Sequence, residues 1–143
     1  LAKEARFQTI IYIDVLEHIE HDSAEINALL EHLKTNGKLV ILSPAHNYLY
    51  SPFDKNIGHF RRYNKKMLRE IMPKALQEEQ LEYLDAVGFF ASLANKLLLN
   101  ASLPSIKQIL FWDKVLVRAS RWIDPLLLNL WGKSILGVWR KAE

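Results

Sequence analysis

The stretch DVLEHIEHD, residues 14–22, gathers carboxylates and imidazoles in a short space. Four of these side chains form a candidate metal-ligand set, namely Glu17, His18, His21 and Asp22, and the two histidines have the i, i+3 spacing of one helix face. A plainer interpretation is the acidic start of a surface helix, because carboxylates stabilise helix N-termini. We favour that interpretation and expect no metal. His18 then serves as a hydrogen-bonding residue or as a general base, because imidazole titrates near neutral pH.

A buried strand followed by a helix would position this stretch. Residues 7–13, FQTIIYI, are apolar nearly throughout, which is typical of a parallel strand covered on both faces. Asp22 and Glu25 have the spacing of a helix N-cap and its partner, and Asn36-Gly37 predicts the C-terminal stop of that helix. Residues 38–44, KLVILSP, read as a second buried strand. The sequence therefore predicts a right-handed βαβ unit.

The middle of the chain differs from a simple connector. Residues 45–63 are rich in Tyr, Phe and His and show no clean period, which indicates a functional loop or lid. The elements expected after it are a helix capped by Asn64, an edge or antiparallel strand over 80–87, an amphipathic helical block over 89–131 broken at Pro104, and a final strand over 134–140.

Composition excludes several classes of protein. The chain has 143 residues, half of them hydrophobic, which suits one globular domain. It contains no Cys, so disulfides, thiolate metal sites and cysteine nucleophiles are excluded. The net charge of +3 is mild and its basic residues are interleaved with acids, so we expect no nucleic-acid partner. No run of about 20 apolar residues is present, so we expect no transmembrane segment. A reducing cytosol is the default compartment for a chain without Cys, so we expect a cytoplasmic location.

Three segments carry a resemblance to a known family. IDVLEHI before a helix, NGKLVILSPAH after it, and then GHFRRYNKKMLRE resemble the C-terminal half of class I S-adenosylmethionine-dependent methyltransferases of the type 11/12-like group. That family has an α/β, Rossmann-like sheet in the order 3-2-1-4-5-7-6, with strand 7 antiparallel. The resemblance implies strands 4-5-7-6 here, within one partial domain. Its expected parts are residues 1–88 from strand 4 to strand 6, a helical insertion over 89–131, and the final strand within 132–143.

The resemblance also implies a cofactor, S-adenosyl-L-methionine, at the end of the first strand. Asp14 would accept a hydrogen bond from the ammonium group of the cofactor, with Val15 and Leu16 as an apolar wall. The alternative is that Asp14 merely ends the strand.

On the acceptor side, the resemblance implies His18 and His59 as catalytic residues. Methyl transfer is an in-line displacement that needs alignment, exclusion of water and, for a hydroxyl acceptor, a base. The implied substrate-binding residues are His46, Tyr50, Arg61 and Arg62, whose guanidinium groups could clamp a phosphate or carboxylate. The alternative for Arg61 is a structural ion pair with Asp54 or a contact with a helix C-terminus.

The acceptor itself is expected to be a small molecule or a lipid-linked molecule, methylated at oxygen. Within the helical block, Lys107, Lys114, Arg118 and Arg121 could face lipid headgroups in a peripheral membrane contact. Packing on the domain, or an oligomer interface, is the plainer interpretation of this block.

The glycine motif that binds the cofactor in this family is missing. No two of the five glycines have the required spacing, so we expect a truncated chain that lacks strands 1 to 3. Open α/β sheets bind ligands at the switch point that this truncation would cut, so the chain alone should bind the cofactor weakly or not at all. The free edge of its first strand should cause self-association. The alternative function is a non-catalytic structural or dimerisation module.

Overall fold

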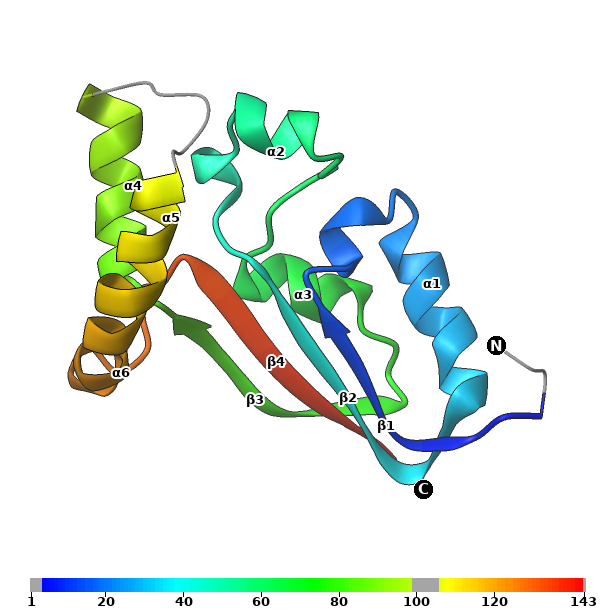
Figure 1. The fold of residues 1–143 in the computed structure, drawn as a ribbon. Coiled ribbons are helices and arrows are strands. Elements are labelled where there is room, and N and C mark those ends of the chain that lie inside the picture. Colours follow the sequence, from blue (N-terminus) through cyan, green and yellow to red (C-terminus); the bar gives the residue numbers. More distant parts are fainter. Residues whose placement is uncertain (1–3, 99–105, 143) are drawn as a thin grey trace.

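The computed structural model describes residues 4–98 and 106–142, and in it four strands form one mixed sheet in the order β1-β2-β4-β3 (Figure 1). The strands are β1 (Phe7–Ile13), β2 (Leu33–Pro44), β3 (Leu76–Leu84) and β4 (Ser134–Lys141). β1 runs parallel to β2, whereas β4 runs antiparallel to both β2 and β3. The predicted order 4-5-7-6, with an antiparallel last strand, is confirmed.

Helices connect the strands and form a separate block at one end of the sheet (Figure 1). Those near the sheet are η1 (Leu16–His18), α1 (Asp22–Leu29), η2 (Leu30–His32), η3 (Asn47–Leu49), α2 (Pro52–Asn56) and α3 (Lys65–Ile71). The block contains α4 (Ala86–Leu98), α5 (Ile106–Phe111), the π-helix η4 (Trp112–Leu116) and α6 (Val117–Leu126). Among the described residues, no helix is both long and apolar enough to cross a bilayer.

The hydrophobic core lies on one face of the sheet. Leu39 and Ile41 of β2 and Trp139 of β4 are buried there, together with Ile26 of α1 and Leu68 of α3. Alternate residues of a strand point to opposite faces, so the neighbours of these core residues face the other side. Burying apolar side chains against α1 and α3 therefore stabilises only one face of the sheet.

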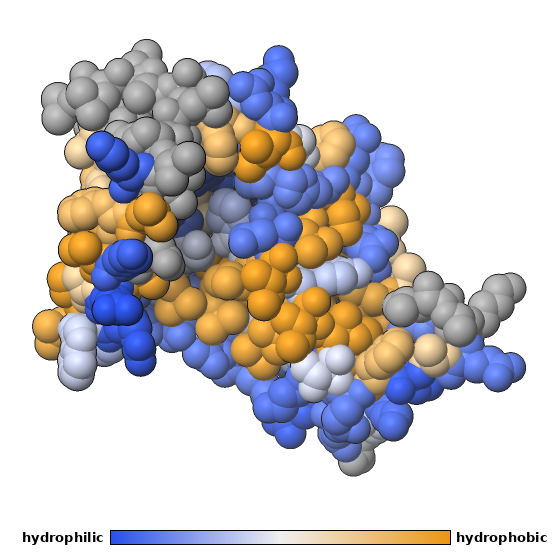
Figure 2. All heavy atoms as spheres, viewed as in Figure 1, coloured by the Kyte–Doolittle hydropathy of each residue, from blue (hydrophilic) through white to orange (hydrophobic). Residues whose placement is uncertain are grey.

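The other face leaves apolar residues in contact with solvent. Ile11 and Ile13 of β1 are 56% and 57% exposed, and Figure 2 shows an apolar area over the centre of the sheet. The expectation that the first strand is covered on both faces is wrong for this chain. The described helices pack on the face that carries Ile10 and Tyr12, so Ile11 and Ile13 on the opposite face stay exposed. β1 is also an edge strand, so no further strand shields its outer side among the described residues.

The first helix also differs from its prediction. Its N-cap is His21 rather than Asp22, and α1 ends at Leu29 instead of continuing to Asn36. Asn36 does adopt the predicted left-handed conformation, with φ 61°, but it lies inside β2 where the register with β1 is irregular. Pairing of Leu33 with Phe7 extends β2 backwards, so tertiary strand pairing replaces the last helical turn.

The helical block begins earlier than predicted because residues from α6 hold its first turn. Asp124 accepts hydrogen bonds from the backbone N–H groups of Asp85 and Ala86, each at 2.8 Å. Ser120 accepts a hydrogen bond from Val87 N at 3.1 Å. These bonds satisfy the N–H groups that a helix start leaves free, so β3 ends at Leu84 rather than Val87. The predicted break at Pro104 lies outside the described residues.

Candidate functional site

The candidate site lies where the three mutually parallel strands end. The residues that follow these strand ends, Asp14, His46 and Asp85, all have left-handed backbone conformations, with φ of 51°, 64° and 66°. Non-glycine residues in this region cost free energy and cluster at functional sites. The carboxyl edge of β1, β2 and β3 is therefore the part of the fold in which to look for chemistry.

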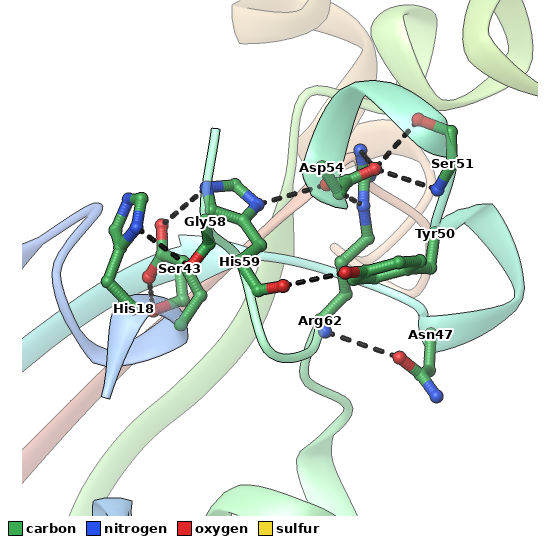
Figure 3. A network of polar contacts seen from close by, with 10 residues as sticks. His18, Ser43, Asn47, Tyr50, Ser51, Asp54, Gly58, His59 and Arg62 are labelled. Atoms are coloured by element: carbon green, nitrogen blue, oxygen red, sulfur yellow. Dashed lines mark hydrogen bonds and ion pairs between the residues drawn. The ribbon is translucent and has the colours of Figure 1, made fainter. Parts of the chain in front are cut away.

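A buried carboxylate, Asp54 of α2, organises the loop after β2 (Figure 3). Arg62 donates to its two oxygens at 2.8 and 3.0 Å, and His59 Nδ1 lies 3.0 Å from Oδ1. Ser51 donates to it from both its backbone N–H and its hydroxyl, each at 2.9 Å. Burial alone would raise the pKa of Asp54, but the hydrogen bonds and the charge of Arg62, with help from Ser51 and His59, lower it below its ordinary value.

A second buried carboxylate, Glu17 of η1, has few partners. Its side chain is fully buried, and Oε2 accepts one hydrogen bond from Ser43 of β2 at 2.9 Å. Oε1 has no hydrogen-bond partner among the described residues and lies 3.9 Å from His59 Nε2. Burial raises the pKa of the Glu17 carboxyl, and the nearby charge of Asp14 adds to this, while a hydrogen bond from its own backbone, the Ser43 hydrogen bond and the charge of His59 act in the opposite direction.

The two histidines predicted as catalytic residues come together although they are far apart in sequence. The rings of His18 and His59 meet edge to face with centroids 4.6 Å apart. His18 Nδ1 lies 3.2 Å from the carbonyl oxygen of Gly58, and Tyr50 donates its hydroxyl to the carbonyl of His59 at 2.6 Å (Figure 3). The structure thus groups His18, His59 and Tyr50, while their catalytic and binding roles stay predictions.

The two arginines of the loop differ in their partners. Arg61 pairs with Asp22 and also donates to the carbonyl of Glu20 at 2.7 Å. Asp22 accepts a further hydrogen bond from the Tyr63 hydroxyl at 2.8 Å. The partner expected for Arg61, Asp54, is taken by Arg62 instead. Arg61 therefore fastens the loop to the start of α1, and its predicted contact with substrate remains untested.

His46 is buried against β3. Its ring stacks on Tyr83 of β3 with centroids 4.5 Å apart, and Nε2 has no hydrogen-bond partner in the described part of the chain. Burial lowers the pKa of His46; a hydrogen bond with the Gly132 backbone opposes this, and the charge of Arg62 adds to it. His46 is therefore held as a neutral imidazole at neutral pH.

The predicted cofactor residues divide between surface and core. Asp14 and Val15 are exposed at the end of β1, where Asp14 N donates to the Leu42 carbonyl of the neighbouring strand. Leu16 is fully buried in the hydrophobic core. Asp14 and Val15 are thus accessible to a ligand at the sheet edge, whereas Leu16 packs in the core.

Sequence reasoning did not place Asp54, Asp85 or Lys133 among the site residues, and named Asp54 only as a possible partner of Arg61. Asp54 had a readable signal, because Ser51 and Asp54 have the spacing of a capping pair before a helix. Asp85 was not recognised because the predicted strand continued to residue 87, whereas β3 ends at Leu84. Lys133 had no local signal; burial lowers its pKa to about 8, against the opposing charge of Asp85.

Metal-ligating side chains also meet at this edge. Within the described ranges, Glu17, His18 and His59 each offer a ligand atom, and these atoms lie within 4.8 Å of one another. His21 and Asp22, which the sequence placed in the same candidate set, do not belong to this group. The group therefore joins η1 to the loop after β2, not to the start of α1.

Comparison with known proteins gives the fold. No protein-family model matches the sequence, and no curated protein matches it. Among solved structures, the chain is similar to the N-methyltransferase NodS from Bradyrhizobium japonicum WM9, at 14% identity over all of this chain and 50% of that one, with a TM-score of 0.51. It is also similar to a SAM-dependent methyltransferase from Archaeoglobus fulgidus, at 15% identity over 97% of this chain and 61% of that one, with a TM-score of 0.57.

A third match is phosphoethanolamine N-methyltransferase 2 from Haemonchus contortus, at 14% identity over 96% of this chain and 34% of that one, with a TM-score of 0.50. The chain thus spans between about a third and two-thirds of the length of these methyltransferases. It has the class I methyltransferase fold over the part that it covers.

Proposed function

We propose that this chain is the C-terminal part of a methyltransferase that uses S-adenosyl-L-methionine to methylate a small-molecule or lipid-linked acceptor at oxygen. The observation that carries the proposal is the sheet order β1-β2-β4-β3 with the polar site at the carboxyl ends of its parallel strands. Open α/β sheets bind their ligands at that edge. The likeness to methyltransferases solved with S-adenosylhomocysteine supports the same cofactor.

In this proposal the chain's own residues bind and orient. Asp14, exposed and held in a left-handed conformation, accepts a hydrogen bond from the ammonium group of the cofactor, and the exposed Val15 forms the apolar wall beside it, with Leu16 packed in the core behind. His18 or His59 removes the proton from an acceptor hydroxyl, because a neutral imidazole within reach of the acceptor is an effective base. His46, Tyr50, Arg61 and Arg62 shape the acceptor side of the site.

The surface of the helical block favours a lipid-linked acceptor. Trp122 and Leu126 of α6 are 82% and 81% exposed, which is rare for such large apolar side chains. The basic side chains on the same block are also exposed, namely Lys107, Lys114, Arg118 and Arg121. Apolar and basic side chains together suit the boundary between lipid headgroups and acyl chains. Sedimentation with anionic vesicles should show binding that Trp122→Ala weakens and that Phe60→Ala, at an exposed site outside the block, does not.

A titration with S-adenosylhomocysteine tests the cofactor proposal. The complete gene product should bind it, and the 143-residue chain should bind it weakly or not at all. Asp14→Asn, which keeps a residue type that tolerates the left-handed backbone, should weaken binding at least tenfold in the complete product. Glu20→Gln, a nearby exposed acid, should leave binding unchanged. A complete product without measurable affinity would refute the proposal.

The second candidate function, a dimerisation module, is favoured by one observation. β1 is an edge strand whose outward residues Ile11 and Ile13 are more than half exposed. Free strand edges pair readily with other chains. Analytical ultracentrifugation should show a self-associating chain, and Ile11→Lys should shift it toward monomer, whereas Val115→Lys on the helical block should not. A stable monomer for the unchanged chain would rule this function out.

A further inference from the structure

Glu17, His18 and His59 are arranged in a way that a hydrogen-bonding network alone does not explain. The carboxyl oxygen Oε1 of Glu17 is buried and aimed at His59 Nε2, but the 3.9 Å between them is too long for a hydrogen bond. A buried carboxylate oxygen without a partner is costly, so an unsatisfied one calls for an explanation. A cation held between the carboxylate and the imidazoles would provide the missing partner.

The hydrogen bonds of the two histidines leave one nitrogen of each ring available to a metal ion. His59 Nδ1 lies 3.0 Å from the Asp54 carboxylate, and His18 Nδ1 lies 3.2 Å from the Gly58 carbonyl. Both partners only accept hydrogen bonds, so Nδ1 carries the proton in each neutral ring. The Nε2 atoms are left with free lone pairs. In metal sites, a histidine commonly donates the N–H of its non-ligating nitrogen to a carboxylate or a backbone carbonyl, which orients the ring.

The Glu17 carboxylate is supported in the same manner. Its second oxygen accepts from the Ser43 hydroxyl at 2.9 Å, which leaves Oε1 toward the histidines. The turn that presents the Gly58 carbonyl to His18 depends on the glycine itself, because Gly58 has φ 84°. Each of the three ligands is thus oriented by a neighbour of its own: Ser43 for Glu17, the Gly58 carbonyl for His18 and Asp54 for His59.

We propose that Glu17, His18 and His59 bind a divalent transition-metal ion of the zinc class. Two imidazoles and one carboxylate suit Zn²⁺, whereas Mg²⁺ and Ca²⁺ prefer sites built from oxygen. The ligand atoms lie within 4.8 Å of one another, so a small inward movement of the exposed His18 ring completes the site. Three protein ligands leave a coordination position open for water or another ligand. His18 also lines a shallow depression of about 610 Å³ together with Phe60.

Metal binding is measured without cofactor or acceptor, so this inference is tested separately from the proposed methyl transfer. With a metal bound, His18 and His59 are ligands and neither acts as the base. Untagged, metal-free protein is titrated with ZnCl₂ by calorimetry, and bound Co²⁺ is followed by its visible absorption. The chain should bind one zinc ion, and excess MgCl₂ should not displace it. His18→Ala should weaken zinc binding at least tenfold, because it removes one of three ligands. Since His18 is exposed, this variant should keep the fold, which circular dichroism checks.

His21→Ala is the matched control, because His21 is an exposed histidine on the same segment but outside the ligand group. It should bind zinc as the unchanged chain does. Glu17→Gln should weaken binding as His18→Ala does. Equal zinc affinity in the unchanged chain and in His18→Ala, or no zinc binding at a ratio of one, would overturn the proposal.

Discussion

Two buried carboxylates at the same edge of the sheet, Asp54 and Glu17, have opposite surroundings. Asp54 accepts five hydrogen bonds, two of them from Arg62, and its pKa lies below the ordinary value. Glu17 accepts one side-chain hydrogen bond, from Ser43, and burial raises its pKa. Both side chains are fully buried. Burial alone therefore does not distinguish a structural carboxylate from one that is available for binding.

The two carboxylates therefore have different roles in the site. Asp54 holds Arg62, His59 and the first turn of α2 in place, so its charge is used within the protein. Glu17 has one carboxylate oxygen, Oε1, that accepts no hydrogen bond from the described residues and is available to a ligand. A buried polar group that is only partly satisfied is unfavourable for stability but is common where a protein binds a ligand. We therefore expect the two carboxylates to respond differently to substitution.

The largest effect is expected for Asp54→Ala. It leaves the buried Arg62 guanidinium without its carboxylate and should lower the free energy of unfolding by about 3–5 kcal/mol. Urea denaturation followed by circular dichroism measures this change. Glu78→Ala is the matched control, because it breaks the exposed Arg69–Glu78 pair, which should contribute about 1 kcal/mol or less. Similar losses for the two variants would contradict the role assigned to Asp54.

A smaller loss is expected at the cap of α4, a third buried carboxylate. Asp124→Ala leaves the backbone N–H groups of Asp85 and Ala86 without acceptors and should cost about 2 kcal/mol. Asp124→Asn keeps one acceptor oxygen and should cost about half as much. Hydrogen exchange at Asp85 and Ala86 reports the change at its source. Unchanged exchange in Asp124→Ala would show that α6 does not hold the start of α4.

The next effect depends on pH and involves His46, which like Glu17 has a polar atom without a partner. Its pKa is lowered from 6.5 in the folded chain, so the unfolded chain binds more protons as the pH falls. The free energy of unfolding should therefore rise with pH up to about 6.5 and decline below it. His46→Phe keeps a stacking ring on Tyr83 and should remove this contribution, whereas His21→Gln should not. Identical pH profiles for His46→Phe and the unchanged chain would reject the assignment.

The smallest change in stability is expected for Glu17→Gln. The amide keeps an acceptor for Ser43 and places a neutral donor near His59 Nε2, so the free energy of unfolding should stay within about 1 kcal/mol of its value in the unchanged metal-free chain. Denaturation in the presence of a chelator measures it. A loss as large as that of Asp54→Ala would show that Glu17 stabilises the fold in the same way as Asp54.

Much of the fold could be predicted from local patterns. The strands over residues 7–13 and 134–141, the cap at Asn64 and the edge character of β3 all follow from hydrophobic periodicity and capping residues. Boundaries failed where a distant segment intervened. Pairing of Leu33 with Phe7 shortened the first helix, and Asp124 moved the start of α4 to Ala86. Such contacts join residues separated by tens of positions, so they cannot be predicted from local propensity.

For the site, the sequence determined which chemical groups are present and that they follow strand ends. Histidines and acids after two parallel strands must meet at one edge of the sheet, so the proximity of residues 14–18 to the loop after β2 was predictable. Only the tertiary structure decided the partners, namely Arg62 rather than Arg61 for Asp54, and His59 beside Glu17. Hydrogen bonding and charge depend on separations of a few ångströms and on the burial of each atom, and both are set by how distant segments pack together.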